Sequence, residues 1–455
     1  MTIPPAFRFD LESLDLLRDV LKRLEQGFSD LPAANPPAGA SYDPANLRRV
    51  LLETAERMHD NYPYFHPLYA GQMLKPPHPV ARLAYALATW INPNNHALDG
   101  GRASSQMEKE AVAEIARMFG WQTHLGHLTG GGTMANLEAL WIAGQLRPDG
   151  VILASEQAHY THHRISGVLK LPFENVPCDR FARIDLQALE DRLRRGGVGT
   201  VVATLGTTAV GSVDPLPEIL ALRERYGFQL HADCAYGGYH GLASNLASAA
   251  RAAFDRLSEV DSIVIDPHKH GLQPYGCGCV LFHDPAVGKF YQHDSPYTYF
   301  SSKELHLGEI SLECSRPGAA AVALWATQRL LPLVRGGEFA GMLSHCRAAA
   351  LELYERLAAD ERFVVAFPPE LDIVVWAVRA KSVSEASDRA REIFARAATQ
   401  GLHLALAELP AAFFNLPSEG QARDLKTITC LRSVLMKPEH ALSLDQVHRR
   451  LSAST

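Results

Sequence analysis

The sequence predicts an α/β fold: a mostly parallel sheet with helices on both faces, followed by a smaller α+β domain. Between about residues 104 and 330, short apolar runs typical of strands alternate with stretches of helical spacing. Strands separated by helices favour parallel pairing, because each helix returns the chain to the same end of the sheet. After Trp325 the pattern becomes a mixture of helices and strands. We therefore expect an N-terminal helical segment (residues 1–60), a large domain (61–325) and a small C-terminal domain (326–455).

The N-terminal segment opens with leucines at helical spacing. Leu14, Leu17, Leu21 and Leu24 predict an amphipathic helix over residues 10–27, with Gly27 as its stop. A link rich in proline, alanine and glycine separates this helix from the rest of the chain. Its apolar face is therefore expected to pack on a partner subunit.

The elements of the two domains follow in order. Helices are expected at residues 106–119 and 134–145, and strands at 151–154, 200–205, 229–232, 262–265 and 279–283. In the small domain we expect a helix through 347–357, a strand at 373–378, a helix at 384–400 and a strand near 427–431. Ligands of such sheets gather beyond the C-terminal ends of the strands, so the loops that follow the strands are the places to seek a site.

Composition excludes several classes of function. A net charge of −6 and a pI near 6.4 provide no basic field for nucleic acid or anionic lipid. The chain shows neither a secretory leader nor an apolar run of the ~18 residues that a membrane helix needs. Seven cysteines, an odd number, indicate reduced thiols and a cytoplasmic location. No metal site is expected, because Cys277 and Cys279 lack zinc-ligand spacing and the histidines near residue 160 have no evident carboxylate partner.

A glycine cluster precedes the helix expected from residue 134. Gly130, Gly131 and Gly132 let the backbone approach an anion closely, and the free amides at the helix start attract negative charge. Thr133 can cap this helix or donate to a phosphate oxygen. A flexible turn with an N-cap explains the cluster equally well.

Asp233 ends an apolar strand in the segment H-A-D-C-A-Y-G-G. A carboxylate here is either a turn former or the partner of a protonated heterocyclic nitrogen. Ala235 is small enough to leave room for a flat ring.

Lys269 lies just beyond another buried strand, in D-P-H-K-H-G. Taken alone, it is more simply explained as a surface lysine. An anion site, a carboxylate and a lysine at neighbouring strand ends are, however, the three anchors that pyridoxal phosphate requires.

At these residues the sequence resembles the group II pyridoxal-dependent amino acid decarboxylases, over roughly residues 60 to 440. The resemblance implies fold type I of the pyridoxal phosphate enzymes, with a mostly parallel sheet of the seven-stranded type. It implies that Lys269 forms the Schiff base and that Asp233 pairs with the pyridine nitrogen, with Ala235 beside the ring. It places Gly132, Thr133 and His268 at the phosphate.

Three further segments are similar to family motifs. In S-E-Q-A-H-Y-T, His159 corresponds to the histidine that stacks on the cofactor ring, whereas His162 and His163 are interpreted as ordinary helix residues. In A-T-L-G-T-T, the resemblance places Thr204 near the ring hydroxyl of the cofactor. Tyr297, in S-P-Y-T-Y, resembles the loop tyrosine that supplies a proton to the substrate carbon, although an ordinary packed tyrosine is an equal alternative.

Two arginines complete the resemblance. Arg432 falls where fold relatives place an arginine that binds the substrate α-carboxylate, and it is our candidate substrate-binding residue. Arg316, in S-R-P-G, resembles both archaeal tyrosine/aspartate decarboxylases and sphingosine-phosphate lyases. Departures also occur, since Met134 replaces a common Glu, and His270-Gly271 replaces the Trp-Leu of animal aromatic decarboxylases.

The function expected from these residues is decarboxylation of an L-amino acid to its amine through Lys269, in a cytoplasmic homodimer with shared active sites. A carbon-carbon lyase acting on a phosphorylated amino alcohol and a transaminase are the alternatives within the same fold. A homologue that binds the cofactor without turnover is the alternative of another class.

Overall fold

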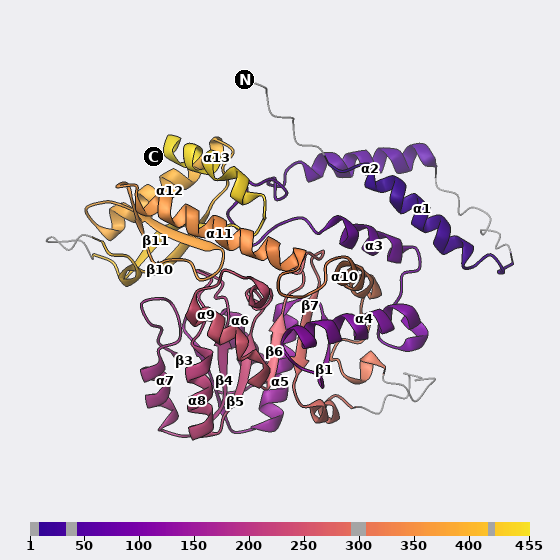
Figure 1. Cartoon of the computed structure of the whole chain (residues 1–455), viewed down its shortest axis with the longest axis horizontal. Coiled ribbons are helices and arrows are strands. Elements are labelled where there is room, and N and C mark those ends of the chain that lie inside the picture. Colours follow the sequence, from indigo (N-terminus) through magenta and orange to yellow (C-terminus); the bar gives the residue numbers. More distant parts are fainter. Residues whose placement is uncertain (1–8, 33–42, 293–305, 417–423) are drawn as a thin grey trace.

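The computed structural model describes residues 9–32, 43–292, 306–416 and 424–455. A seven-stranded sheet with the strand order β1-β7-β6-β5-β4-β2-β3 forms the large domain (Figure 1). Strands β2 to β6 pair in parallel, whereas β7 runs antiparallel to both β6 and β1. The strands are β1 (Leu125–Thr129), β2 (Val151–Ser155), β3 (Phe173–Val176), β4 (Val198–Thr204), β5 (Gln229–Asp233), β6 (Ser262–Ile265) and β7 (Gly278–Phe282). The expected mostly parallel sheet is therefore confirmed.

Helices cover both faces of this sheet because alternate strand residues point to opposite sides. On one face, α5 and α6 bury Ile152, Val202 and Val264. On the other face, α4, α7, α8, α9 and α10 bury Leu153, Val201 and their neighbours. The helices of the domain are α3 (Pro79–Thr89), α4 (Leu98–Met118), α5 (Gly132–Leu146), α6 (Thr161–Leu169), α7 (Leu186–Leu193), α8 (Leu216–Tyr226), α9 (Ser248–Asp255) and α10 (Gly318–Leu330).

The small domain is a four-stranded antiparallel sheet, β10-β11-β9-β8, packed against three helices. Its elements are α11 (Glu338–Ala358), β8 (Phe363–Val365), β9 (Ile373–Val378), α12 (Val383–Thr399), β10 (Ala405–Pro410), β11 (Thr427–Val434) and α13 (His440–Ala453). Two boundary expectations need adjustment. Helix α10 continues through Trp325 to Leu330, and Leu68 and Ala70 lie in the core of the small domain although they were expected in the large one.

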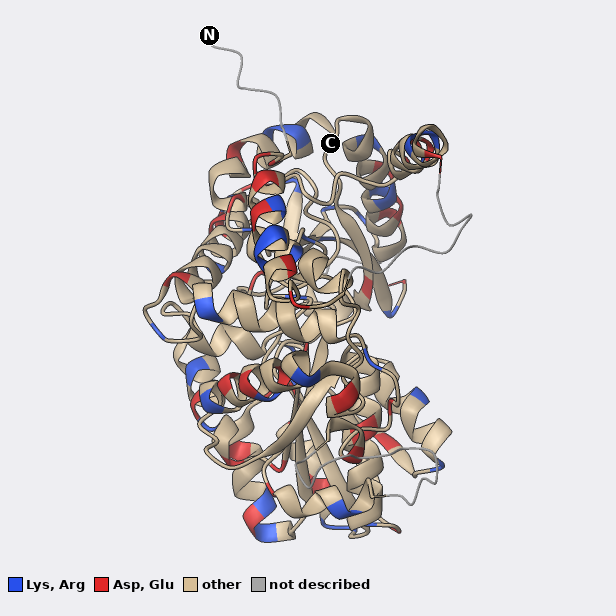
Figure 2. Cartoon of the chain, turned by 90° about the vertical axis from the view of Figure 1, so that its right-hand side faces the viewer, with Lys and Arg blue, Asp and Glu red and all other residues tan. Residues whose placement is uncertain are grey.

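The N-terminal segment forms two helices, α1 (Ser13–Gln26) and α2 (Pro44–Met58), at the edge of the molecule (Figure 1). Neither helix contains a buried residue, and Leu14, Leu16, Leu47 and Leu51 are all exposed. Acidic and basic residues are interspersed along the outer helices (Figure 2), in keeping with the small net charge. Among the described helices, none has the length and apolarity needed to cross a membrane.

Candidate active site

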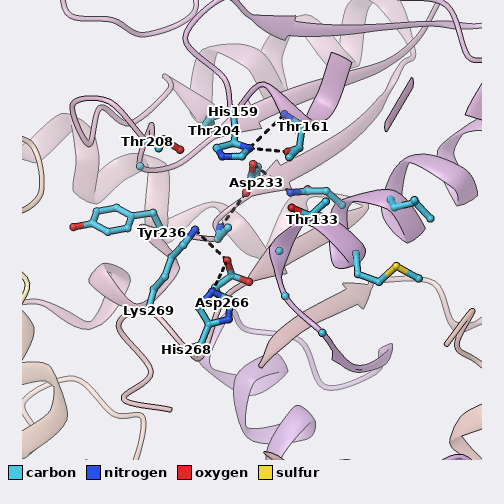
Figure 3. Close-up of a pocket in the computed structure, with 18 of the residues that line it drawn as sticks. Thr133, His159, Thr161, Thr204, Thr208, Asp233, Tyr236, Asp266, His268 and Lys269 are labelled. Atoms are coloured by element: carbon cyan, nitrogen blue, oxygen red, sulfur yellow. Dashed lines mark hydrogen bonds and ion pairs between the residues drawn. The ribbon is translucent and has the colours of Figure 1, made fainter. Parts of the chain in front are cut away.

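A cavity of about 630 Å³ lies beyond the carboxyl ends of the parallel strands, as expected for such a sheet (Figure 3). Thr204 and Asp233 are the last residues of β4 and β5, and the segment containing Lys269 follows β6. The cavity brings together every residue that the sequence assigned to the cofactor: Gly132, Thr133, His159, Thr204, Asp233, Ala235, His268 and Lys269.

The glycine turn is shaped for a group that approaches its backbone. Gly131 has φ +147°, a conformation that side chains disfavour, and a Cβ added to it would lie 3.3 Å from Cε1 of His268. A Cβ on Gly132 would come within 2.6 Å of Oδ2 of Asp266. Helix α5 begins here with Gly131 as its N-cap, so Thr133 lines the cavity from inside the first turn and does not cap the helix. The free amides of this turn are suited to bind an anion.

Asp233 is a buried carboxylate that accepts hydrogen bonds from three directions. Nε2 of His162 lies 2.8 Å from its Oδ2, Nδ2 of Asn136 lies 3.5 Å from the same oxygen, and the Ala235 amide donates to Oδ1 at 3.0 Å. Burial alone would raise the pKa of Asp233, but His162, His231 and the Ala235 amide hold that pKa well below its usual range. Asp233 is therefore an anion at the base of the cavity.

The interpretation of His162 as an ordinary helix residue was wrong. Its side chain is 1% exposed and pairs with Asp233, whereas His163 is exposed and packs against Phe173. The chain does contain a carboxylate partner for this histidine. Sequence inspection missed the pair because Asp233 is remote in sequence and the two meet only through the sheet.

Behind Asp233, a second layer of hydrogen bonds reaches β6. Nε2 of His231 lies 2.9 Å from Oδ1 of Asn136, and its Nδ1 lies 2.8 Å from the hydroxyl of Ser262. Burial lowers the pKa of His231 to about 3, so this imidazole is neutral. The amide of Asn136 is thereby oriented with its NH₂ group toward Asp233.

Lys269 extends into the cavity with its Nζ 3.0 Å from Oδ2 of Asp266, and that oxygen also lies 3.6 Å from Nε2 of His268 (Figure 3). The ring of His268 lies 4.7 Å from that of Tyr275. Sequence inspection did not predict the contact of Asp266 with the lysine. Asp266 comes three residues before Lys269, so one turn of backbone brings the carboxylate to the ammonium.

His159 lies at the opposite side of the cavity from the glycine turn. Its Nδ1 accepts the Thr161 amide at 3.3 Å and lies 2.8 Å from the Thr161 hydroxyl. Burial, opposed in part by Asp233, lowers the pKa of His159. A neutral ring that carries its proton on Nε2 therefore faces the cavity.

Two further residues were predicted for the site. Tyr297 lies outside the described residues. Arg432 is buried behind the cavity wall, where Nε donates to the Ala209 carbonyl at 2.9 Å and an Nη donates to the Thr208 carbonyl at 2.7 Å. Its other Nη lies 3.2 Å from Oε1 of Gln72. The role of Arg432 toward a substrate carboxylate stays a prediction that these contacts do not support.

Arg316 is also committed to the protein itself. One Nη lies 2.6 Å from Oε1 of Glu108 and 2.7 Å from the Leu128 carbonyl, and both side chains of the ion pair are buried. Arg316 thus joins the start of α10 to α4 and the end of β1.

The pyridoxal-dependent decarboxylase conserved domain matches residues 141–379, which is more than half of the chain. The chain belongs to this family. It is 27% identical to an L-tyrosine decarboxylase of Enterococcus faecium, with 78% of this chain and 77% of the relative covered. It is 28% identical to a probable L-tyrosine/L-aspartate decarboxylase of Methanothermobacter thermautotrophicus, with 71% and 86% covered.

Solved structures agree on the fold. The structure of mouse CSAD in apo form has a TM-score of 0.77 at 20% identity, covering 95% of this chain and 91% of that one. The expected fold type I architecture is confirmed.

The residues present fit pyridoxal phosphate, the cofactor of this family. The glycine turn and the start of α5 would hold the phosphate, and the anionic Asp233 would hold a protonated ring nitrogen. Within the part of the chain that the structure describes, the buried Oγ1 of Thr204 and Nδ1 of His268 have no hydrogen-bond partner, so both are available to the cofactor. Lys269 offers its amine between these two ends.

Proposed function

We propose that this chain removes the α-carboxylate of an L-amino acid and releases the corresponding amine and carbon dioxide, with pyridoxal phosphate as cofactor. The observation that carries the proposal is the convergence of Lys269, Asp233, His159 and the glycine turn on one cavity. Pyridoxal phosphate supplies an aldehyde that joins amines and a ring that accepts the electron pair left behind when carbon dioxide departs.

The residues of the chain have separable tasks in this reaction. Lys269 provides the amine that holds the cofactor and that the substrate amine displaces. Asp233, kept anionic by its three donors, holds a proton on the ring nitrogen and so favours electron withdrawal from the substrate carbon. The neutral ring of His159 would orient the cofactor ring, and the unpartnered hydroxyl of Thr204 would bind its ring hydroxyl. Tyr297 remains our candidate for the group that returns a proton to the substrate carbon.

The lyase alternative loses its main support, because it depended on the S-R-P-G segment. The guanidinium of Arg316 is occupied by Glu108 and the Leu128 carbonyl, so it is not offered to a substrate phosphate. These contacts support a structural task for the segment.

We propose further that the enzyme is a cytoplasmic homodimer. Support for the dimer comes from α2, whose leucines are exposed, and from Leu14 and Leu16 of α1, which are also exposed although Leu17, Leu21 and Leu24 are half-buried. Burying such a surface against a second copy is favourable by about 25 cal/mol per Å². The expected cytoplasmic location rests on the odd number of cysteines, all of which are free.

The cofactor proposal is tested by borohydride reduction of the cofactor-loaded enzyme, followed by peptide mapping. We expect a single pyridoxyl adduct on Lys269 and none in Lys269→Ala. Two other largely buried lysines, Lys75 and Lys437, serve as internal controls for non-specific modification. An adduct that maps to either of them in place of Lys269 would refute the assignment.

The activity is tested by incubating the loaded enzyme with each common L-amino acid and measuring carbon dioxide. The named relatives act on tyrosine or aspartate, which differ in charge and size, so the screen must cover all side-chain classes. Release of carbon dioxide with a stoichiometric amine supports decarboxylation. Formation of a keto acid without carbon dioxide would instead identify a transaminase.

A further inference from the structure

The carboxylate of Asp372, from the small domain, contacts residues of the large domain next to the active site. Asp372 comes immediately before β9, and its carbonyl accepts a hydrogen bond from the Leu435 amide at 2.8 Å. Its side chain is fully buried. A buried charge is costly unless other groups compensate it, so its surroundings call for an explanation.

The two oxygens of Asp372 meet two residues that border the active site. The hydroxyl of Tyr236 donates to Oδ1 at 2.5 Å, and Tyr236 lines the cavity. Nε2 of His270 lies 3.2 Å from Oδ2, and His270 directly follows Lys269. Nε2 of His240 lies 3.8 Å from the same oxygen. His270 is one of the positions at which the sequence departs from the animal aromatic decarboxylases.

The neighbouring backbone is shaped for this contact. Gly206 has φ +109°, and a Cβ added to it would lie 3.0 Å from Cδ1 of Leu371, the residue before Asp372. A Cβ on Gly237, the residue after Tyr236, would meet the same Leu371 atom at 3.0 Å. The chain at 371–372 therefore fits closely against the turns that carry Thr204 and Tyr236.

A metal ion is one occupant to consider, since ligand atoms of His240, His270 and Asp372 lie within 4.8 Å of one another. The surrounding charge opposes it. Lys75 and Arg347 already act electrostatically on His240, and Asp372 acts on the buried Arg432. A dication would add a further positive charge to this neighbourhood.

The protonation states agree with a neutral-histidine arrangement. Burial lowers the pKa of His240 to about 3 and also lowers the pKa of His270. Burial alone would raise the pKa of Asp372, but His270, His240 and the Tyr236 hydroxyl hold it well below its usual range. Asp372 is thus an anion that accepts the Tyr236 hydroxyl, with the Nε2 atom of His270 3.2 Å from its other oxygen.

We propose that Asp372 is a positioning residue of the active site, holding Tyr236 in the cavity wall and His270 behind Lys269. Docking of the small domain thereby sets the cofactor lysine in place. The proposal rests on the decarboxylase function inferred above. Asp372 does not line the cavity and acts through Tyr236 and His270.

The test uses Asp372→Asn, Tyr236→Phe and the double variant of the cofactor-loaded enzyme. Asparagine keeps the size of Asp372 but replaces one acceptor with a donor, and phenylalanine removes only the Tyr236 hydroxyl. We expect each single variant to lower kcat at least tenfold with less than a threefold change in KM. The double variant should lose little more than either single one, because both changes break the same contact. Asp445→Asn is the matched control, since Asp445 is an exposed carboxylate of the same domain.

Visible circular dichroism of the bound cofactor reports how the cofactor is held. Its intensity would stay unchanged if Asp372 served only to stabilise the fold. We expect its intensity to change in Asp372→Asn and Tyr236→Phe while the melting temperature of Tyr236→Phe stays near that of the wild type. Multiplicative losses of kcat in the double variant, or an unchanged dichroic band in Tyr236→Phe, overturn the proposal. If Asp372→Asn does not fold, Tyr236→Phe and His270→Asn decide by the same two measurements.

Two further outcomes are informative. One equivalent of tightly bound metal in the wild type, lost in Asp372→Asn, would overturn the proposal in favour of a metal site. If the wild type releases no carbon dioxide from any amino acid, the proposed function fails. The dichroic band still tests the positioning of the cofactor in that case.

Discussion

Replacing His162 by leucine tests whether Asp233 depends on a partner that the sequence motifs did not identify. Leucine approximates the volume of the imidazole but removes the donor 2.8 Å from Oδ2 of Asp233. Asn136 at 3.5 Å is the only other side chain recorded on that oxygen among the described residues. The substitution therefore leaves a buried carboxylate under-satisfied.

The expected loss follows from the energy of that contact. A hydrogen bond to a charged, buried group contributes about 1.5–3 kcal/mol. Without it, the pKa of Asp233 rises, and the charge that holds the ring nitrogen becomes weaker. At about 1.4 kcal/mol for each factor of ten, we expect pyridoxal phosphate to bind about tenfold to a hundredfold more weakly to His162→Leu.

The assay is a titration of cofactor-free enzyme with pyridoxal phosphate at neutral pH and in mildly acidic buffer. A carboxylate whose pKa is depressed in the folded state stabilises that state at every pH above the ordinary pKa of Asp. The stabilisation is lost as the pH falls through the folded-state pKa. The variant should therefore lose affinity at a higher pH than the wild type. His163→Leu, which changes an exposed neighbour on α6, should bind within twofold of the wild type. Wild-type affinity and pH dependence in His162→Leu would refute the reasoning.

Four other substitutions test separate parts of the structure. Arg316→Met leaves the carboxylate of Glu108 buried without its cation, so denaturant titration should show a loss of about 3–5 kcal/mol. Gly206→Ala places a side chain on a residue with φ +109° and brings its Cβ to 2.8 Å from the Gly237 amide nitrogen. We expect a lower melting temperature, and an unchanged melting temperature would contradict this geometry. Burial lowers the pKa of Lys437 to about 7. Above that pH, Lys437 is protonated in the unfolded chain but not in the folded chain. The free energy of unfolding therefore rises with pH, by up to about 1.4 kcal/mol per pH unit. Lys437→Met should flatten that slope in denaturant titrations. Leu51→Asp places a charge on the exposed face of α2, and sedimentation should then show a monomer if that face holds the proposed dimer together.

Local sequence patterns predicted the elements whose signal lies within a few residues. The apolar run at 262–265 coincides with β6, and the glycine cluster does open α5. Short strands at edges, β1 and β3, were missed because they lack a long apolar run. Helix α2 was missed because its apolar residues point to solvent in one chain and form no conventional core stripe.

The site was predicted as far as its residues share short motifs. Lys269, Asp233 and His159 were found because each lies in a distinctive segment at a strand end. Asn136, His162 and Tyr236 were not, because their tasks depend on contacts between segments far apart in the chain. Asp266 was also missed, although only three residues separate it from Lys269. For Arg432 the motif position did not reveal that two backbone carbonyls accept hydrogen bonds from its guanidinium, and its role toward a substrate stays a prediction.

The position of residues 68–70 has a consequence for how the chain folds. The Ala70 amide donates to the His403 carbonyl at 2.9 Å, and the Val434 amide donates to the Ala70 carbonyl at 2.7 Å. Residues 68–70 are synthesised early, but their partners at 403 and 434 are synthesised near the end. Contacts between residues so far apart in sequence form slowly, because a long loop must close. A fragment that begins after α10 would lack part of its own core. The core of the small domain therefore needs segments from both ends of the chain. An enzyme truncated within β11 should have neither a complete small domain nor its contact with the large domain.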